Sequence, residues 1–253
     1  NSPYYINNTV FVATGNTLEI ESGCEIIFYP NTRLEINGGI QATGVHFTGT
    51  DPQLGWPGIY LESQDQEIQF TNCLIEHAHR GLYFQNTNGT ISNTTITKEN
   101  DFPNEVGVLV NGYSNPHFNN MDIINYAFGF MFSNETRTSS TPSLNNTRIR
   151  NTSSTLRTES HGLDVLGAVG LTVNNADIEE YDYGVYWNGL GTTDYRSTPS
   201  LNNTRIRNTS STLRTVTKGV KMIDVSRVTI ANDSIVGYPT GLEITNDGSG
   251  LLT

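Results

Sequence analysis

The sequence is poor in the features that mark several common classes of protein. It has two cysteines among 253 residues, Cys24 and Cys73, which are too few for a disulfide framework and lack the spacing of a zinc site. A disulfide between the two cysteines and a pair of buried free thiols are the two alternatives. No apolar run approaches the roughly 20 residues of a membrane-spanning helix, so no membrane span is expected.

Positive charge is also scarce. The chain has 14 Lys and Arg against 25 Asp and Glu, which gives a net charge of −11. A protein that binds nucleic acid normally presents a basic face, so this balance argues against nucleic acid as a partner. No signal peptide is visible at Asn1, and we expect the chain to be a mature form or an excised piece.

Long runs of strong helix formers are absent as well. The apolar fraction is only 35%, while glycine, with 24 residues, is abundant. This mixture favours many short strands joined by turns. Nine Asn-x-Ser/Thr sequons are acceptors for glycosylation only in a host with the machinery.

What is present is repetition. The segment Ser140–Thr158 recurs without change at Ser197–Thr215, at an offset of 57 residues (197 − 140). A shorter pattern, Asn-x-x-Ile, recurs in seven successive units of the chain, at spacings of 21 to 29 residues. Its asparagines are Asn72, Asn93, Asn120, Asn146, Asn175, Asn203 and Asn232. An apolar residue lies two positions before each asparagine, and a glycine followed by an apolar-x-apolar strand comes later in each unit.

Units of this length are too short to fold alone, but each can form one coil of a solenoid. Stacked coils bury each apolar residue on its equivalents above and below. The sequence therefore predicts an all-β chain, a single parallel β-helix of roughly 9–10 coils. We expect the asparagines to point inward as an internal ladder that satisfies buried polar groups, and the glycines to form bends with unusual dihedrals.

The regularity of the pattern divides the chain. Residues 1–65 alternate like the start of the same stack but in a less clear register, and residues 66–253 form the regular coils. Within the regular part we predict a two-coil super-repeat of about 57 residues, at 140–196 and 197–253. Long insertions are expected at Lys98–Glu105, Thr152–His161 and Thr209–Lys218, on one side of the stack.

Charged residues give a partly independent check of the alignment. The column two residues after the asparagines includes Asp122, Arg148, Asp177 and Arg205, whose signs alternate. Opposite charges on neighbouring coils attract, whereas like charges would repel. In the column two residues further on, Glu179 stands between Arg150 and Arg207, which we expect to pair with it. Arg205 and Arg207 lack acidic residues on the following coil, so we expect the natural chain to continue past Thr253.

Four segments carry a family resemblance: Leu18–Gly23, Leu34–Gly38, Trp56–Ile59 and Asn72–Ala78. They resemble the repeat pattern of the right-handed parallel β-helix superfamily, in particular secreted, pectin-lyase-like repeat proteins of bacteria and archaea. The resemblance implies right-handed coils and an extracellular or cell-surface location. That superfamily includes pectin and alginate lyases, glycoside hydrolases, adhesins and structural surface proteins, so the resemblance leaves the activity open.

The best cluster for catalysis is Glu76, His77, His79 and Arg80, which combines acid, base and cation. The same residues also fit an ordinary coil turn, and this structural interpretation is preferred. No paired Asp-Asp, Gly-His-Gly or Arg-x-Lys motif of the related lyases and hydrolases occurs. The sequence therefore favours no catalytic residue.

Two weaker groups are candidates for binding. Glu180 and Asp182 are candidates for a Ca²⁺ site, although the favoured prediction is that no cofactor is bound. Tyr83 and Tyr186 fall in one outward column and are candidates for stacking on sugars. Ordinary surface tyrosines are the competing interpretation.

The function favoured by the sequence is that of a non-catalytic surface protein, adhesive or structural. Its expected partners are a polysaccharide or cell-surface glycan, or further copies of itself that assemble into a filament or coat. The alternative is a polysaccharide-active enzyme, a lyase or glycoside hydrolase, or a carbohydrate-binding module.

Overall fold

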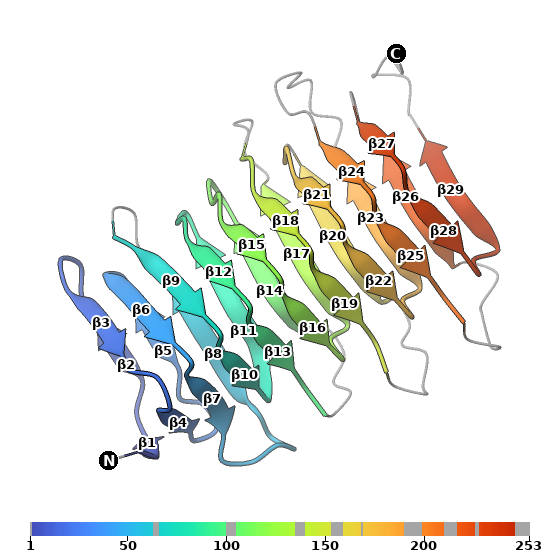
Figure 1. Cartoon of the computed structure of the whole chain (residues 1–253). Helices are drawn as coiled ribbons and strands as arrows, with labels where there is room; N and C mark the ends of the chain where they lie inside the picture. Colours follow the sequence, from blue (N-terminus) through green and yellow to red (C-terminus); the bar gives the residue numbers. More distant parts are fainter. Residues whose placement is uncertain are drawn as a thin grey trace.

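The protein is an elongated stack of short strands (Figure 1). The computed structural model describes residues 2–62, 66–99, 105–134, 140–152, 159–167, 169–189, 199–209, 217–225 and 228–245. Within these ranges the secondary structure is all β, and no helix is long and apolar enough to cross a membrane. The first strand, β1 (Tyr4–Ile6), and the last, β29 (Thr240–Thr245), lie at opposite ends of the stack.

Each coil adds one strand to each of three parallel sheets, so the strands of a sheet are spaced three elements apart in the chain. Sheet A, in stacking order, contains β1 (Tyr4–Ile6), β4 (Glu25–Phe28), β7 (His46–Gly49), β10 (Leu74–Glu76), β13 (Thr95–Thr97), β16 (Asp122–Ile124), β19 (Arg148–Arg150), β22 (Asp177–Glu179), β25 (Arg205–Arg207) and β28 (Ser234–Val236).

Sheet B contains β2 (Val10–Val12), β5 (Leu34–Ile36), β8 (Trp56–Leu61), β11 (Ala78–Gln85), β14 (Val106–Asn111), β17 (Phe128–Asn134), β20 (His161–Gly167), β23 (Tyr183–Asn188), β26 (Lys218–Ile223) and β29 (Thr240–Thr245). Sheet C contains β3 (Thr17–Ile20), β6 (Gly39–Thr43), β9 (Ile68–Thr71), β12 (Thr90–Ser92), β15 (His117–Asn119), β18 (Ser143–Asn145), β21 (Thr172–Asn174), β24 (Ser200–Asn202) and β27 (Thr229–Ala231). The predicted parallel β-helix is confirmed.

The core runs along the axis of the stack. Ile75, Ile96 and Ile123 occupy one register position on successive strands of sheet A and are fully buried. Buried aromatic rings also pack between coils, and Phe28 stacks on Trp56 with ring centroids 4.0 Å apart. This burial is the main stabilising contribution, because each inward side chain leaves water for its neighbours on adjacent coils.

The seven asparagines of the repeat occupy the turn between sheets C and A, but their side chains are exposed rather than inward. Each has a positive φ, between 50° and 59°. Asparagine tolerates this left-handed conformation better than other residues with a side chain, which explains its recurrence. A ladder does form on the outside, where Asn120 Nδ2 donates to Asn93 Oδ1 at 2.9 Å and Asn175 Nδ2 donates to Asn146 Oδ1 at 3.1 Å.

A second asparagine ladder was not anticipated from the sequence. It lies at the last position of four sheet C strands, at Asn119, Asn145, Asn174 and Asn202. The Nδ2 of each of the last three donates to Oδ1 of the asparagine on the preceding strand at 3.0 to 3.1 Å. Identical amides stacked at the strand spacing can each act as donor and acceptor, so this ladder ties the coils together.

The repeated glycines also correct an expectation. The described glycines with positive φ do not include Gly81, Gly107, Gly129, Gly162, Gly184, Gly219 or Gly241. They lie within sheet B strands, and the role of all except Gly241, at the end of the stack, is close packing. A Cβ on Gly129 would stand 2.2 Å from Ile149 Cγ2 and 2.6 Å from the carbonyl oxygen of Gly162. Only glycine fits where the backbone meets the core isoleucine.

Both cysteines are free thiols, Cys73 buried and Cys24 partly exposed. The two copies of the unchanged segment supply β18–β19 and β24–β25, with β21 and β22 between them. The central parts of the three expected insertions, residues 100–104, 153–158 and 210–216, lie outside the described residues.

Candidate functional site

The Glu76 carboxylate lies on the outer face of sheet A. Its Oε2 is 2.7 Å from Nε2 of His46 on β7, whose other ring nitrogen is 3.3 Å from Glu25. The Glu76 carbonyl oxygen accepts the indole hydrogen of Trp56 at 2.8 Å. Glu76 therefore links three consecutive strands of sheet A and anchors a core tryptophan.

The two neighbouring histidines have other partners. His77 has a φ of 60° at the turn from sheet A to sheet B, and its Nδ1 is 3.1 Å from Thr48 Oγ1. His79 Nδ1 is 2.5 Å from Glu105 Oε1. The second oxygen of Glu105 pairs with Lys98, which is only 1% exposed. The two histidine contacts join adjacent coils, and the Lys98–Glu105 pair lies within one coil.

Arg80 points to the outer face of sheet B, where it donates to the hydroxyl of Tyr60 at 3.4 Å and lies 5.8 Å from the ring centre of Tyr83. The four weak catalytic candidates thus contact different neighbours on two sheets. A structural role accounts for each of them.

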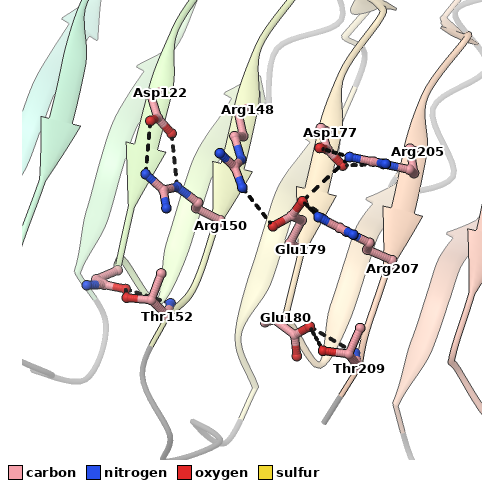
Figure 2. A network of polar contacts seen from close by, with 11 residues as sticks. Asp122, Arg148, Arg150, Thr152, Asp177, Glu179, Glu180, Arg205, Arg207 and Thr209 are labelled. Atoms are coloured by element: carbon pink, nitrogen blue, oxygen red, sulfur yellow. Dashed lines mark hydrogen bonds and ion pairs between the residues drawn. The ribbon is translucent and has the colours of Figure 1, made fainter.

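The arginine columns form a polar network on sheet A (Figure 2). The register pairs Asp122 with Arg148, Arg148 with Asp177, and Asp177 with Arg205, as the charge alternation predicted. Glu179 accepts a hydrogen bond from Arg207 Nε at 2.9 Å and from Arg148 at 3.3 Å.

One partner in this network differs from the expectation. Arg150 was expected to pair with Glu179, but its guanidinium lies 3.2 Å from Asp122 instead. Long side chains reach diagonally across a sheet, so register alone does not select between two carboxylates.

The two carboxylates proposed for Ca²⁺ are engaged separately. Glu180 Oε1 accepts hydrogen bonds from the backbone N–H of Thr209 at 2.8 Å and from its hydroxyl at 2.7 Å. Asp182 is 1% exposed and accepts from the backbone N–H of Ser160 at 3.3 Å. Within the described part of the chain, no three His, Cys, Asp or Glu side chains are grouped as a metal ion requires. The Ca²⁺ site stays a sequence-based prediction.

The tyrosine candidates belong to two aromatic patches on the outer face of sheet B. In the first patch, Tyr60 and Tyr83 meet edge to face with centroids 5.2 Å apart. Arg33 lies 4.5 Å from the ring centre of Tyr60. A hydrogen bond to Glu35 is the main cause that raises the pKa of Arg33, and Arg33 and Glu35 form an ion pair. Arg80 supplies a second cation to the patch, beside Tyr83.

The second patch surrounds His161. Its ring stacks on Tyr186 at 4.9 Å and meets Tyr183 edge-on at 4.9 Å. The ammonium of Lys221 lies 5.7 Å from the centre of Tyr186. Tyr83 and Tyr186 share one register column four strands apart, about 19 Å at the strand spacing.

Sequence reasoning missed the polar centre of this second patch. His161 Nδ1 lies 3.1 Å from Asp164 Oδ2, and the two residues are 9% and 5% exposed. Among the described residues, Asp164 Oδ1 has no hydrogen-bond partner. The available signal was an aspartate and a histidine at outward positions of one strand, next to tyrosines on the following strand.

Solved structures with similar overall shape are very distant in sequence. An alginate lyase from Paenibacillus sp. str. FPU-7 is 11% identical with a TM-score of 0.44, covering 97% of this chain and 99% of that chain. Pectate lyase Pel9A is 11% identical with a TM-score of 0.47, covering 100% of this chain and 67% of that one. The A-module of the Azotobacter vinelandii mannuronan C-5 epimerase AlgE4 is 11% identical with a TM-score of 0.41, covering 98% and 90%.

These activities belong to those proteins, and similarity at this level does not carry them to this chain. No curated protein sequence matches the chain significantly. The family model described as "Right handed beta helix region" matches residues 33–193, which is more than half of the 253 residues. The chain therefore belongs to the right-handed β-helix family.

Proposed function

We propose that the chain is a non-catalytic extracellular β-helix protein that adheres to acidic polysaccharide through the outer face of sheet B. The observation that carries the proposal is the association of tyrosines with cations on that face, Tyr60 with Arg33 and Tyr186 with Lys221. The acid, base and cation candidates of the Glu76 segment are all engaged between coils, which supports a non-catalytic role.

Aromatic rings and cations serve complementary purposes in binding an acidic sugar. A tyrosine ring offers apolar surface to the C–H groups of a pyranose, and a cation attracts its carboxylate. The chain has a net charge of −11, so an acidic polymer is repelled except where cations gather. Patches about 19 Å apart on one rigid face favour an extended polymer over a single sugar.

The test is affinity electrophoresis of the whole chain in gels containing polygalacturonate, alginate or a neutral glucan. We expect retardation by the acidic polymers, reduced by Tyr60→Ala and by Lys221→Ala. Tyr29→Ala is the matched control, since Tyr29 is 45% exposed and lies outside both patches. Equal mobility in all gels would contradict the proposal.

The buried His161–Asp164 pair favours a second candidate, a polysaccharide-active enzyme. A carboxylate beside an imidazole orients the ring for proton transfer, as a general base requires. Assays for unsaturated product and for reducing sugar on uronate polymers, with and without Ca²⁺, distinguish the two functions. Turnover that His161→Asn abolishes while retardation persists would replace the adhesive proposal by the enzymatic one.

A further inference from the structure

A polar cavity of about 330 Å³ lies on another part of the molecule, at the edge of sheet C. Its lining comes from three successive coils: Glu67 just before β9, Asn88 and Thr90 at the start of β12, and Asn115 and His117 at the start of β15. None of these residues belongs to the aromatic patches of sheet B. The cavity is at the small end of the range for ligand pockets, the size for one or two sugar units.

The lining combines hydrogen-bonding groups with a small apolar floor. A carboxylate, the three amides of Gln66, Asn88 and Asn115, a hydroxyl and an imidazole can together donate to and accept from the hydroxyls of a ligand. The floor includes Ile68 and Gly89. A Cβ on Gly89 would lie 2.9 Å from the Cβ of Ile68, so the turn packs directly on β9.

Bonds between coils hold the lining in place. Asn88 Oδ1 accepts from the backbone N–H of Asn115 at 2.8 Å, and His117 Nδ1 is 2.8 Å from Ser143 Oγ. Glu67 Oε2 accepts from Gln41 Nε2 at 3.0 Å. A site whose groups are already positioned loses less conformational entropy when a ligand binds.

Charge limits the chemistry of that ligand. The lining contains one carboxylate, Glu67, and neither lysine nor arginine. An anionic sugar would meet a negative group without a countercharge, whereas a neutral sugar would find an acceptor for its hydroxyls. Tyr113, on the same turn as Asn115, is 53% exposed and adds accessible aromatic surface nearby.

The geometry points to a binding site for a neutral pyranose in the cavity formed by Glu67, Asn88, Thr90, Asn115 and His117. It is separate from the acidic polymer surface of sheet B, and it does not depend on the proposed function. The occupant is a neutral sugar unit, recognised through its hydroxyls.

The test uses saturation-transfer NMR with the methyl glycosides of glucose, galactose and mannose, and methyl galacturonoside as the acidic counterpart. The whole chain is produced without N-glycosylation, because Asn88 also begins an Asn-x-Thr sequon. We expect at least one neutral glycoside to bind and the acidic one to bind at least threefold more weakly. Thr90→Val, which removes one hydroxyl at nearly constant shape, should weaken binding by about 3- to 10-fold.

Thr229→Val is the matched control, because Thr229 is also exposed and occupies the same register column of sheet C, five strands away. Its affinity should equal that of the wild type, as should that of Tyr60→Ala on sheet B. The inference is overturned if no neutral glycoside binds, if the acidic one binds better, or if Thr90→Val and Thr229→Val behave alike. Failure of the sheet B proposal would leave these outcomes unchanged.

Discussion

Arg207 on β25 donates its Nε hydrogen to Oε1 of Glu179 on the neighbouring strand β22 at 2.9 Å. Arg148 reaches the other oxygen of Glu179 from the opposite side at 3.3 Å (Figure 2). One carboxylate, whose side chain is 10% exposed, therefore connects three coils. The two arginines come from the two copies of the unchanged segment, and Glu179 comes from the coil between them.

Replacement of Glu179 by alanine should destabilise the stack. The substitution leaves the arginines of the two flanking strands, β19 and β25, without their shared carboxylate, so we expect a loss of about 1–3 kcal/mol in the free energy of unfolding. Urea denaturation followed by far-UV circular dichroism measures it. Glu243→Ala, which removes a carboxylate paired with Lys218 near the end of the stack, should have a smaller effect. A larger loss of stability in Glu243→Ala than in Glu179→Ala would contradict the central role of Glu179.

The neighbouring Asp177 should make stability depend on acid pH. Partial burial by itself raises the pKa of Asp177, but hydrogen bonds with Arg205 and Glu179 and the positive charges of Arg205 and Arg207 lower it overall. Because the folded-state pKa lies below the unfolded value of about 3.9, the stabilisation is present above that value and disappears as pH falls through the folded-state pKa. The urea midpoint of the wild type should exceed that of Asp177→Asn at pH 7, and the gap should narrow at pH 3. A difference in urea midpoint that is the same at pH 7 and pH 3 would contradict a stabilising role of the ionised Asp177.

The repeated glycines of the sheet B strands, from Gly81 to Gly241, should tolerate replacement by alanine only at the last position. Alanine at position 129 would bring Cβ to 2.2 Å from Ile149 Cγ2, and we expect Gly129→Ala to cost about 1–3 kcal/mol by overpacking. In Gly241→Ala, which is the matched control, the nearest atom is 3.9 Å away. Thermal unfolding of the two variants compares them. Equal midpoints would show that close packing is not the reason for glycine here.

The exposed asparagines should be replaceable by glycine but not by a β-branched residue. Asn203 has a φ of 51° at the turn from sheet C to sheet A. Valine in the left-handed region should cost about 1–3 kcal/mol, whereas glycine adopts it freely. Chemical denaturation of Asn203→Val and Asn203→Gly gives the comparison. Similar destabilisation by both would indicate that the amide group, and not the backbone conformation, is what the turn requires.

The two thiols should differ in reactivity. Burial raises the pKa of the Cys73 thiol, which slows its reaction with a thiol reagent, while Cys24 is partly exposed. A colorimetric thiol titration of the native chain should show one faster and one slower group, and Cys24→Ser should remove the faster one. In denaturant without reductant both should react. A chain with no reactive thiol in denaturant would instead contain a disulfide.

The register could be read from the sequence because a stack of coils repeats its constraints. The columns of Asn72, Ile75 and Gly81 follow from the same strand positions in every coil, and the alternating charges of Asp122 and Arg148 agree with them. Periodicity cannot indicate on which side of a turn a side chain lies. The asparagines were therefore placed inward, although their φ values turn them outward.

The candidate sites were predicted less well for a related reason. Glu76 and Arg80 are close in sequence, but sheet A ends between them and the chain turns to sheet B, so their side chains have separate partners. The cavity beside Thr90 and His117 is formed by turns of three different coils, so no single segment of the sequence predicts it.

By itself, the sequence determined the fold: the repeating pattern, the parallel stack and the register of its strands, because every coil must bury the same positions on its neighbours. Only the tertiary structure decided which side chains meet across coils. In the folded chain Arg150 pairs with Asp122 rather than with Glu179, and His161 is buried beside Asp164. The cavity at the edge of sheet C likewise exists only where turns of three coils meet. Those outcomes depend on side-chain reach and turn geometry, which vary among coils of identical register.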